Sequence, residues 1–515
     1  MAHNFYNLGM YFEHIAEQHS SEAAVSFDYG QIAYKELNKI ANQIANFLIS
    51  RNIFTNDVVG IYNSKTINGY AAMLACLKIG AAYTNFDGEN PIERQDKIFS
   101  TCKPKLVLTD YLLDEKTTFF LESKGIEICQ IHDNNLFRNQ DVSNLPRSKK
   151  VIGSCPAYIM FTSGSTGHPK GVVISHLSVI SFIDWSVDRF KITSEDRFAQ
   201  VSPLYFDNSV FDFYTALFSG ASLVPINRKE ILNAKKLVFL LSKYPCSIWF
   251  SVPTLLIYLQ KTKLIENSIF RSIRAFIFGG EGFPKSQLKK LFYLVSDRAH
   301  LINVYGPTEA TCICSAHQIN VSDFDDMSRL APLGELNQNF QCLILDNELN
   351  EVSPGEKGEL CLLGPNLALG YFNNLEITKE KFIQNPKLPD YPNTMYRTGD
   401  LVMEKGGLLW FLGRVDNQIK HLGYRIELEE IETALNSISN LRQSVVTYQK
   451  SGHDNSELIA HIVTIRKTSS QDIITKLRSI LPYYMIPKTY KFYTSLPTNQ
   501  NGKVDKKALE RWYKS

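Results

Sequence analysis

Short apolar runs rich in β-branched and aromatic residues alternate with segments of helical period over the N-terminal part of the chain. The runs predicted to be strands are 57–62, 105–110, 157–162, 246–252, 274–280 and 300–306. Strands that alternate with helices are typical of parallel sheets whose faces are covered by helices. The pattern therefore predicts an α/β fold.

The pattern changes beyond about residue 350. Turn signals there separate short apolar runs, as in 353–364 and 406–414, which predicts a small β-rich lobe. Segment 425–438 then has one apolar and one acidic face, which predicts an amphipathic helix. A second helix is predicted from an N-cap at Ser470 to a stop near Pro482.

The polar segment RVDNQ, residues 414–418, separates two regions of apolar pattern and is the predicted hinge. We therefore predict two domains. The large N-terminal domain, 1–416, would contain the parallel sheets and the β-rich lobe, and would bind ATP and substrate. The C-terminal domain, 417–515, would be smaller, mobile and α+β.

The charges of the 515 residues nearly balance, with 55 Lys and Arg against 52 Asp and Glu and a net charge of +3. Because this balance predicts no broad basic surface, nucleic acid is not an expected partner. The nine cysteines form no CxxC pair, which is typical of reduced thiols in a cytoplasmic protein. No signal peptide or apolar stretch of about 20 residues is visible, so no membrane association is expected.

The segment YIMFTSGSTGHPKGVVISH, residues 158–176, concentrates the candidate chemistry. A predicted strand leads into hydroxyl and glycine residues that can surround phosphate oxygens, with Lys170 supplying positive charge. These residues are Thr162, Ser163, Gly164, Ser165, Thr166 and Gly167. The segment matches neither Walker A nor GxGxxG, and Ser163 stands where a GxSxG nucleophile elbow requires glycine. Loops of this composition are usually plain exposed turns, and the order of the residues adds support for a polyphosphate-binding loop.

Five further motifs follow in order: NVYGPTEAT (303–311), GELCLLGPNLALGYFNN (358–374), YRTGDL (396–401), GRVDNQIKHLGYRIELEEIE (413–432) and NGKVDKKAL (501–509). With these motifs the chain resembles the adenylate-forming, AMP-producing ligases. That family includes amino-acid adenylation domains of nonribosomal peptide synthesis, D-alanine–carrier protein ligases and acyl-CoA synthetases. The resemblance implies that a carboxylate attacks the α-phosphate of ATP, releasing pyrophosphate, and that the acyl group then passes to a thiol. It also implies ATP and Mg²⁺ as cofactors.

The resemblance implies roles for individual residues as well. Lys503 would bridge the substrate carboxylate and the α-phosphate, and Glu309 would bind Mg²⁺. Tyr305 would stack on adenine, and Asp400 would accept hydrogen bonds from the ribose. Asp416 would be the hinge between the two half-reactions. The charged residues expected in catalysis are Lys170, Glu309, Arg414 and Lys503, and those expected to bind ATP are Thr162, Ser163, Gly164, Ser165, Thr166, Gly167, Gly280, Asn303, Tyr305, Thr308, Asp400 and Arg414.

The segment FDNSVFDF, residues 206–213, resembles the one with which amino-acid-activating members of the family hold their substrate. Asp207 would pair with the α-ammonium group, which a fatty acid lacks, and Lys503 would hold the carboxylate. The expected pocket lining is Asn208, Phe211, Phe250, Ile277, Gly279, Val304, Cys312 and Ile313. Because this lining is apolar and Gly279 leaves room at one wall, the expected substrate is isoleucine, valine or leucine. Asn208 departs from the usual small or apolar residue and has no assigned role.

Three alternatives remain open. Segments 181–185 and 279–284 of this chain resemble the D-alanine–carrier protein ligases, which usually have a bulkier residue in place of Gly279. Acyl-CoA synthetase activity is disfavoured by Asp207. A non-catalytic nucleotide- or amino-acid-binding paralogue is disfavoured by the presence of Lys170, Glu309, Asp400 and Lys503. Since the chain ends at Ser515, soon after the last motif, the expected thiol partner is a separate carrier protein with a phosphopantetheine arm.

Overall fold

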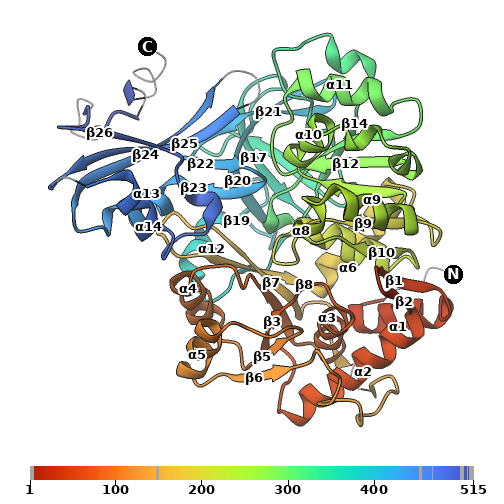
Figure 1. Cartoon of the computed structure of the whole chain (residues 1–515). Helices are drawn as coiled ribbons and strands as arrows, with labels where there is room; N and C mark the ends of the chain where they lie inside the picture. The colour runs from red at the N-terminus through yellow and green to blue at the C-terminus, as the bar shows by residue number, and fades with distance from the viewer. Residues whose placement is uncertain are drawn as a thin grey trace. The chain divides into compact units, whose positions relative to one another are not determined.

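Figure 1 shows the chain as a computed structural model, which describes residues 5–146, 150–451, 455–466, 468–498, 504–506 and 508–509. The chain divides into two compact units. Unit 1 consists of Met1–Gly88, Cys102–Phe161 and Gly171–Val415, and unit 2 of Glu89–Thr101, Thr162–Lys170 and Asp416–Ser515. The two short segments of unit 2 lie outside the predicted C-terminal domain, 417–515.

The first large sheet of unit 1 has seven strands in the order β18-β8-β7-β4-β3-β5-β6. The pairs β7–β4, β4–β3, β3–β5 and β5–β6 are parallel, whereas β18 pairs antiparallel with β8. The strands are β3 (Val58–Tyr62), β4 (Ala82–Phe86), β5 (Leu106–Thr109), β6 (Glu127–Gln130), β7 (Pro156–Thr162), β8 (Lys170–Ser175) and β18 (Gly370–Tyr371). The three strands predicted in this region are confirmed as β3, β5 and β7.

The second large sheet has nine strands in the order β15-β14-β13-β12-β11-β9-β10-β1-β2. Its centre, from β13 to β1, is parallel, and antiparallel strands close both ends. The strands are β1 (Ala23–Phe27), β2 (Gly30–Ala33), β9 (Arg197–Gln200), β10 (Ser222–Pro225), β11 (Ile248–Ser251), β12 (Ala275–Gly279), β13 (His300–Tyr305), β14 (Ser315–Gln318) and β15 (Glu335–Leu336). The predicted parallel α/β architecture is confirmed here as well, with β11, β12 and β13 at the predicted runs.

Helix α3 is buried on every side, from Asn68 to Ile79, which explains why its sequence is apolar all round. The hydroxyl of Thr66 caps its first turn, and Gly80 ends it with a left-handed φ of 75°. Helices α1 and α2 pack against it. The helices of unit 1 are α1 (Leu8–Gln18), α2 (Tyr34–Ser50), α3 (Ile67–Ile79), α5 (Glu115–Ser123), α6 (His176–Arg189), α7 (Asn208–Val210), α8 (Arg228–Ile231), α9 (Ala234–Lys243), α10 (Pro253–Lys261), α11 (Lys285–Val295) and α12 (Leu375–Lys381).

The predicted β-rich lobe is a five-stranded sheet within unit 1. Strands β16, β17, β20 and β19 follow one another across it, and β21 pairs with the second half of the long strand β20. All of its pairs are antiparallel. The strands are β16 (Gln341–Leu345), β17 (Gly358–Leu363), β19 (Phe382–Gln384), β20 (Thr394–Lys405) and β21 (Leu408–Arg414).

Unit 2 combines a three-stranded sheet, a two-stranded hairpin and three α-helices among its described residues. Its elements are α4 (Ile92–Cys102), β22 (Gln418–His421), β23 (Tyr424–Glu427), α13 (Leu428–Asn436), β24 (Leu441–Ser451), β25 (Asn455–Thr464), α14 (Ser470–Leu477) and β26 (Thr489–Tyr493). Helix α14 begins at Ser470 with Ser469, and not the predicted Ser470, as its N-cap, and it ends before the predicted stop near Pro482. Helix α13 begins three residues later than predicted, because Arg425–Glu427 pair with β22.

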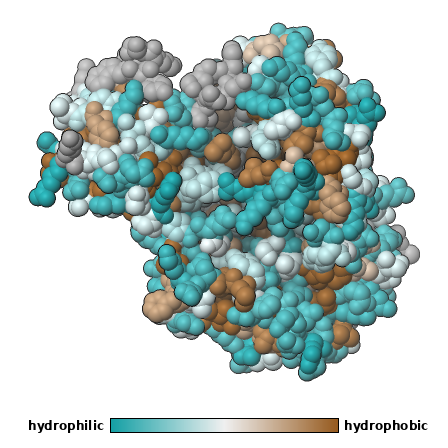
Figure 2. All heavy atoms as spheres, in the orientation of Figure 1, coloured by the Kyte–Doolittle hydropathy of each residue, from teal (hydrophilic) through white to brown (hydrophobic). Residues whose placement is uncertain are grey.

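The surface is mostly hydrophilic and the cysteines are mostly buried, as is usual for a globular protein. On the face shown in Figure 2, hydrophilic residues cover most of the surface and hydrophobic residues form separate small groups. None of the helices among the described residues is long and apolar enough to span a bilayer. All nine cysteines lie in the described part of the chain and are free thiols, and only Cys342 is not buried.

Candidate active site

The side chains predicted to bind an amino acid lie toward the carboxyl ends of the neighbouring parallel strands β11, β12 and β13, where open α/β sheets usually bind ligands. Phe250 pairs with Ile277 across β11 and β12, and Gly279 pairs with Val304 across β12 and β13. All four residues are buried. The sheet register therefore brings these four predicted residues together.

Phe211 adds an aromatic wall from a different element. It opens the π-helical turn Phe211–Thr215, which continues the short helix α7. Its ring meets the ring of Phe250 edge-on, with centroids 5.2 Å apart and planes at 77°. Edge-on pairs of this kind are favourable beyond their buried area, so the two rings hold each other in place.

A strained turn carries two further predicted pocket residues, Cys312 and Ile313. Thr311 and Cys312 both have left-handed φ angles, 54° and 72°, which are rare for residues with a Cβ and tend to occur at functional sites. The Thr311 hydroxyl donates to the carbonyl oxygen of Asn366 at 2.6 Å. Gly306 makes the turn possible, since a Cβ there would lie 2.2 Å from the Cys312 carbonyl oxygen.

Gly279 does not leave an open wall, contrary to the expectation from the sequence. A Cβ on Gly279 would lie 2.4 Å from the carbonyl oxygen of Val304 and 2.8 Å from its Cγ2. The neighbouring strand fills the space that the missing side chain leaves. Gly279 is therefore required for the close approach of β12 and β13, and its lack of a side chain does not by itself widen the pocket.

Replacing Gly279 by alanine is expected to destabilise unit 1 by about 1 to 3 kcal/mol, because the added methyl group overlaps backbone atoms that cannot move cheaply. Urea unfolding of the variant and the parent protein measures the difference. Gly355→Ala is the matched control, since a Cβ there meets nothing within 4 Å and only its φ of 88° is unfavourable. A Gly279→Ala variant as stable as the parent would contradict the packing described above.

Asp207 and Asn208 lie at the start of α7. Asp207 is half-buried, and its Oδ2 accepts a hydrogen bond from the hydroxyl of Thr308. The half-buried Asn208 places its Nδ2 3.9 Å from the point that a Cβ on Gly280 would occupy. Asn208 thus lies between residues predicted to bind substrate and Gly280, which is predicted to bind ATP.

Three side chains predicted to bind the nucleoside form one hydrogen-bonded group. Asp400, 3% exposed, accepts from the guanidinium of Arg414 through Oδ1 at 2.5 Å and from the hydroxyl of Tyr305 through Oδ2 at 2.6 Å. Burial, and then the charge of Asp400, raise the pKa of Tyr305 well above its usual value, so its hydroxyl stays a donor. Nearby on β13, the amide of Asn303 donates to the carbonyl oxygen of Pro332 at 2.7 Å.

Glu309 is the predicted magnesium ligand. It is 1% exposed, and its Oε1 accepts a hydrogen bond from the hydroxyl of Tyr371 at 2.7 Å. Among the described residues, no three His, Cys, Asp or Glu side chains gather to hold an ion. Protein-bound Mg²⁺ commonly uses one or two carboxylates together with substrate phosphates, so a single oriented carboxylate fits this ion.

The predicted phosphate loop lies in unit 2. A Cβ on Gly164 would lie 2.0 Å from the carbonyl oxygen of His168, and Gly167 has a left-handed φ of 77°, so the loop needs glycine at both positions. The hydroxyl of Ser163 donates to the carbonyl oxygen of Arg425 at 2.8 Å, and Lys97 donates to the carbonyl oxygen of Gly167 at 3.2 Å. The remaining residues of the loop, Thr162, Ser165 and Thr166, complete it between β7 and β8.

Lys170, at the end of this loop, forms an ion pair with Glu427 of β23, 3.9 Å apart. Both side chains are largely buried, at 12% and 7% exposure. The amide of Gln418 donates to Glu427 at 2.6 Å and accepts from Arg425 at 2.8 Å. Burial raises the pKa of Glu427, while the charge of Lys170 opposes the rise.

Two predicted residues remain. The carboxylate of Asp416, the predicted hinge, accepts a hydrogen bond from the backbone N–H of Gln418 at 3.2 Å. Lys503 lies outside the described residues. Its expected role in catalysis therefore stays a prediction.

The structure adds side chains that the sequence did not single out. Glu427 and Gln418 belong to the motif 413–432, so the motif could have suggested them, although no role was assigned. Tyr371 belongs to the motif 358–374 and was likewise passed over. Their contacts depend on chain segments far apart in sequence, which periodicity does not reveal.

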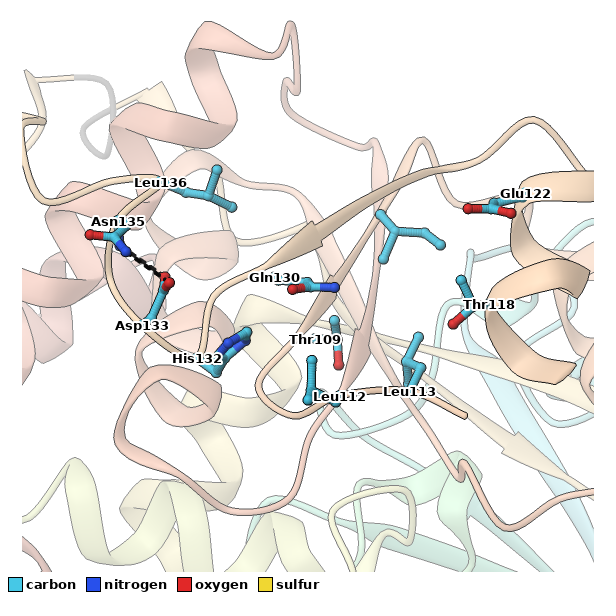
Figure 3. A pocket seen from close by; sticks show the side chains of 11 residues that line it. Thr109, Leu112, Leu113, Thr118, Glu122, Gln130, His132, Asp133, Asn135 and Leu136 are labelled. Carbon is cyan, nitrogen blue, oxygen red and sulfur yellow. Dashed lines mark hydrogen bonds between the residues drawn. The ribbon is translucent and has the colours of Figure 1, made fainter. Parts of the chain in front are cut away.

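A cavity of about 500 Å³ lies elsewhere in unit 1, beside α5 and β6 (Figure 3). Leu112, Leu113 and Leu136 contribute apolar side chains to it. Asn135 donates to Asp133 at 2.8 Å on its rim. None of the predicted site residues lines this cavity, so it is separate from the candidate active site.

The sequence profile of the AMP-binding enzyme family matches residues 12–372, and the chain belongs to this family. The chain is 34% identical over 501 residues to bacitracin synthase 1 of Bacillus licheniformis. This aligned region covers 97% of this chain and 9% of that protein. It is 32% identical over 505 residues to tyrocidine synthase 1 of Brevibacillus parabrevis. This aligned region covers 97% of this chain and 44% of that protein. The chain thus spans less than half the length of these two relatives.

Solved structures share the fold. An artificially fused adenylation–PCP di-domain NRPS from Klebsiella oxytoca, NpsA-ThdA, has a TM-score of 0.80 at 22% identity and covers 95% of this chain and 94% of its own. The o-succinylbenzoate CoA synthetase of Bacillus subtilis has a TM-score of 0.84 at 20% identity and covers 98% of both chains. At these identities the likeness concerns the fold alone, which therefore does not choose between thiol acceptors.

Proposed function

We propose that the protein is an AMP-forming ligase that activates an amino acid as its adenylate, releases pyrophosphate, and transfers the acyl group to the phosphopantetheine thiol of a carrier protein. The proposed amino acid has a branched aliphatic side chain, as in isoleucine, valine or leucine. The observation that carries the proposal is the Asp207 carboxylate, oriented by Thr308, together with the buried apolar side chains that are predicted to line the pocket.

The charge of Asp207 supports an amino acid over a simple carboxylic acid. A half-buried carboxylate is matched by an ammonium group in a charge-assisted hydrogen bond. A fatty acid would bring no positive charge to this half-buried carboxylate, which makes it the less favourable substrate. The aromatic and aliphatic lining offers the substrate side chain no charged group, so an aliphatic side chain is favoured.

The chain's own residues would bind and orient the nucleotide. ATP supplies the pyrophosphate leaving group, and Mg²⁺ offsets the negative charge of its phosphates. Glu309 would hold the ion, and Asp400, fixed by Arg414 and Tyr305, would accept the ribose hydroxyls. Ser163 and Lys170 would supply a hydroxyl and a positive charge to the phosphates.

Amino-acid-dependent exchange of labelled pyrophosphate into ATP tests the proposal. We would assay all L-amino acids, D-alanine and short fatty acids in the presence of Mg²⁺. We expect the strongest exchange with isoleucine, valine or leucine. A D-alanine maximum would favour the D-alanine–carrier protein ligase, a fatty-acid maximum would favour an acyl-CoA synthetase, and ATP binding without any exchange would favour a non-catalytic binding protein.

Replacing Glu427 by glutamine is expected to raise the affinity for ATP several-fold. In the structure Glu427 pairs with Lys170, whose positive charge the phosphates would otherwise use. Because burial raises the pKa of Glu427, the parent carboxylate takes up a proton as the pH falls towards that raised pKa. The advantage of the variant should therefore shrink at lower pH.

Titration of the protein with a fluorescent ATP analogue at several pH values measures this effect. Glu429→Gln is the matched control, because Glu429 receives a hydrogen bond from Asn417 and not from the phosphate loop. Equal or weaker nucleotide binding by Glu427→Gln would contradict competition between Glu427 and phosphate.

A further inference from the structure

The segment that joins β9 to α7, residues 201–207, ends at Asp207. All of these residues are described, and none of them lies in a strand or a helix. Two successive turns shape the segment, because the backbone N–H of Phe206 donates to the carbonyl oxygen of Pro203 at 3.1 Å and that of Ser209 donates to Phe206 at 3.0 Å. A functional side chain on a loop is held precisely when neighbouring groups support the loop. The support of this segment therefore bears on the position of Asp207.

Two buried side chains from the region of the seven-stranded sheet hold this segment. The Nζ of Lys65, just beyond β3, donates to the carbonyl oxygens of Gln200 and Ile226, each at 2.9 Å. The Nδ2 of Asn85, in β4, donates to the carbonyl oxygen of Leu204 at 3.2 Å. The two side chains are 7% and 9% exposed. The lysine thus fixes the residue before the segment, and Asn85 fixes the middle of the segment itself.

A relay of hydrogen bonds sets the orientation of the Asn85 amide. The backbone N–H of Lys65 donates to the Oδ1 of Asn63 at 2.9 Å, and the Nδ2 of Asn63 donates to the Oδ1 of Asn85 at 3.4 Å. A backbone N–H can only donate and the Leu204 carbonyl can only accept, so each amide has one orientation that completes the relay. The other N–H of Asn85 faces the sulfur of Met73 at 3.8 Å. Asn85 therefore presents a donor to the segment.

The relay starts from a turn, residues 63–66, that is itself firmly held. The buried carboxylate of Asp110 accepts from the backbone N–H of Ser64 at 2.9 Å and from its hydroxyl at 2.8 Å. Helix α3 packs closely on the turn, since a Cβ on Gly69 would lie 2.2 Å from the Oδ1 of Asn63 and 2.4 Å from the Oδ2 of Asp110. The relay thus connects a fixed turn to the segment.

We infer that Asn85 is a positioning residue for recognition of the substrate ammonium group: its bond to the Leu204 carbonyl fixes the segment that presents Asp207. The inference rests on the proposed function, because it concerns binding of the amino acid. Two supports then locate the carboxylate, the hydroxyl of Thr308 at its Oδ2 and Asn85 through the backbone. A displacement of about 1 Å can cost about 100-fold in rate, so a support remote from the substrate matters.

The first variant is Asn85→Leu, which keeps a similar size and removes the donor. Its KM for the preferred amino acid in pyrophosphate exchange should rise at least about fivefold, with a smaller change in kcat. Its preference for the amino acid over the same acid without the α-amine should fall in proportion, because the displaced group is the ammonium partner. Loss of stability alone would not change that preference. The affinity for a fluorescent ATP analogue should stay within about twofold of the parent.

The second variant, Asn63→Asp, tests the relay from a side chain one step further from the segment. The new carboxylate still accepts from the backbone N–H of Lys65, but it has no N–H for Asn85. The Asn85 amide is then expected to turn its Nδ2 towards that carboxylate and its oxygen towards the Leu204 carbonyl. KM and the preference for the amine should shift in the same direction as in Asn85→Leu. This variant also tests the inference if Asn85→Leu does not fold.

Asn42→Leu is the matched control. Asn42, in α2, is 0% exposed, and its Nδ2 donates to the backbone carbonyl oxygen of Val142 at 2.8 Å, which lies in another loop. This variant should melt at a lower temperature with the KM and the preference of the parent.

Three results would count against these assignments. Parental KM and preference in folded Asn85→Leu, or in Asn63→Asp if the first variant does not fold, would overturn the inference. An equal shift in Asn42→Leu would also overturn it, because the effect would then follow lost stability. Absence of exchange in the parent with every amino acid would instead overturn the proposed function.

Discussion

Alanine in place of Asp207 should lower kcat/KM for the amino acid in pyrophosphate exchange by roughly 100- to 5000-fold. The carboxylate is half-buried and oriented by Thr308, so it would meet the α-ammonium group with little reorganisation. Leaving a buried charge without its partner costs about 3 to 5 kcal/mol, and each 1.36 kcal/mol corresponds to a tenfold change in rate. The exchange assay with purified variant and parent measures this loss.

Two comparisons make the result specific to the ammonium group. Thr308→Val removes a hydrogen bond to Asp207 and should lower kcat/KM for the amino acid about fivefold. Because Thr308 is also expected to bind ATP, this comparison is made at saturating ATP. If isoleucine is the substrate, the parent should strongly prefer it to 3-methylpentanoic acid, which has the same carbon skeleton without the amine, and Asp207→Ala should lose that preference. A variant that keeps both its rate and its preference would rule out Asp207 as the ammonium partner.

Alanine in place of Asp400 should weaken ATP binding by roughly 10- to 100-fold, because hydrogen bonds to a charged group contribute about 1.5 to 3 kcal/mol. The same change leaves Arg414, whose side chain is 11% exposed, without its carboxylate. We therefore expect a lower melting temperature as well. Equilibrium titration with ATP and thermal unfolding measure the two effects.

Arg397→Met separates the two effects of the Asp400 substitution. Arg397 lies on the same strand β20 and pairs with Glu359 at 2.6 Å, so its loss also breaks a partly buried ion pair. It should lower the melting temperature without a change in ATP affinity. Equal ATP affinities for Asp400→Ala and the parent would exclude Asp400 from the nucleotide site.

Six strands of the two large sheets could be predicted because each is a short apolar run bounded by turn signals; they are β3, β5, β7, β11, β12 and β13. The beginning of α13 could not, because Arg425–Glu427 have helical periodicity in sequence and form β23 only through their pairing with β22. The segments 89–101 and 162–170 belong to unit 2 through contacts distant in sequence. Local pattern fixes neither of these features, since tertiary pairing overrides propensity.

The candidate site residues within motifs are predictions from the sequence, and the structural reasons for some of them could not be predicted. Gly279 was expected to widen the pocket, whereas its Cβ position is occupied by Val304 of the adjacent strand. Lys65 stands in no pattern that marks a buried charge, and its bonds to the carbonyl oxygens of Gln200 and Ile226 appear only once β9 and β10 are assembled. A sequence shows which groups are present, and packing determines which of them meet.

Cys312 places a sulfur atom beside the pocket in which the proposed mixed anhydride would form. Burial, and then the charge of Asp207, raise the pKa of this thiol well above its usual value. Only the thiolate is a strong nucleophile, so Cys312 stays chemically quiet at neutral pH. The substrate site would therefore hold the reactive acyl phosphate without acylation of Cys312. The incoming thiol would remain the acceptor of the acyl group.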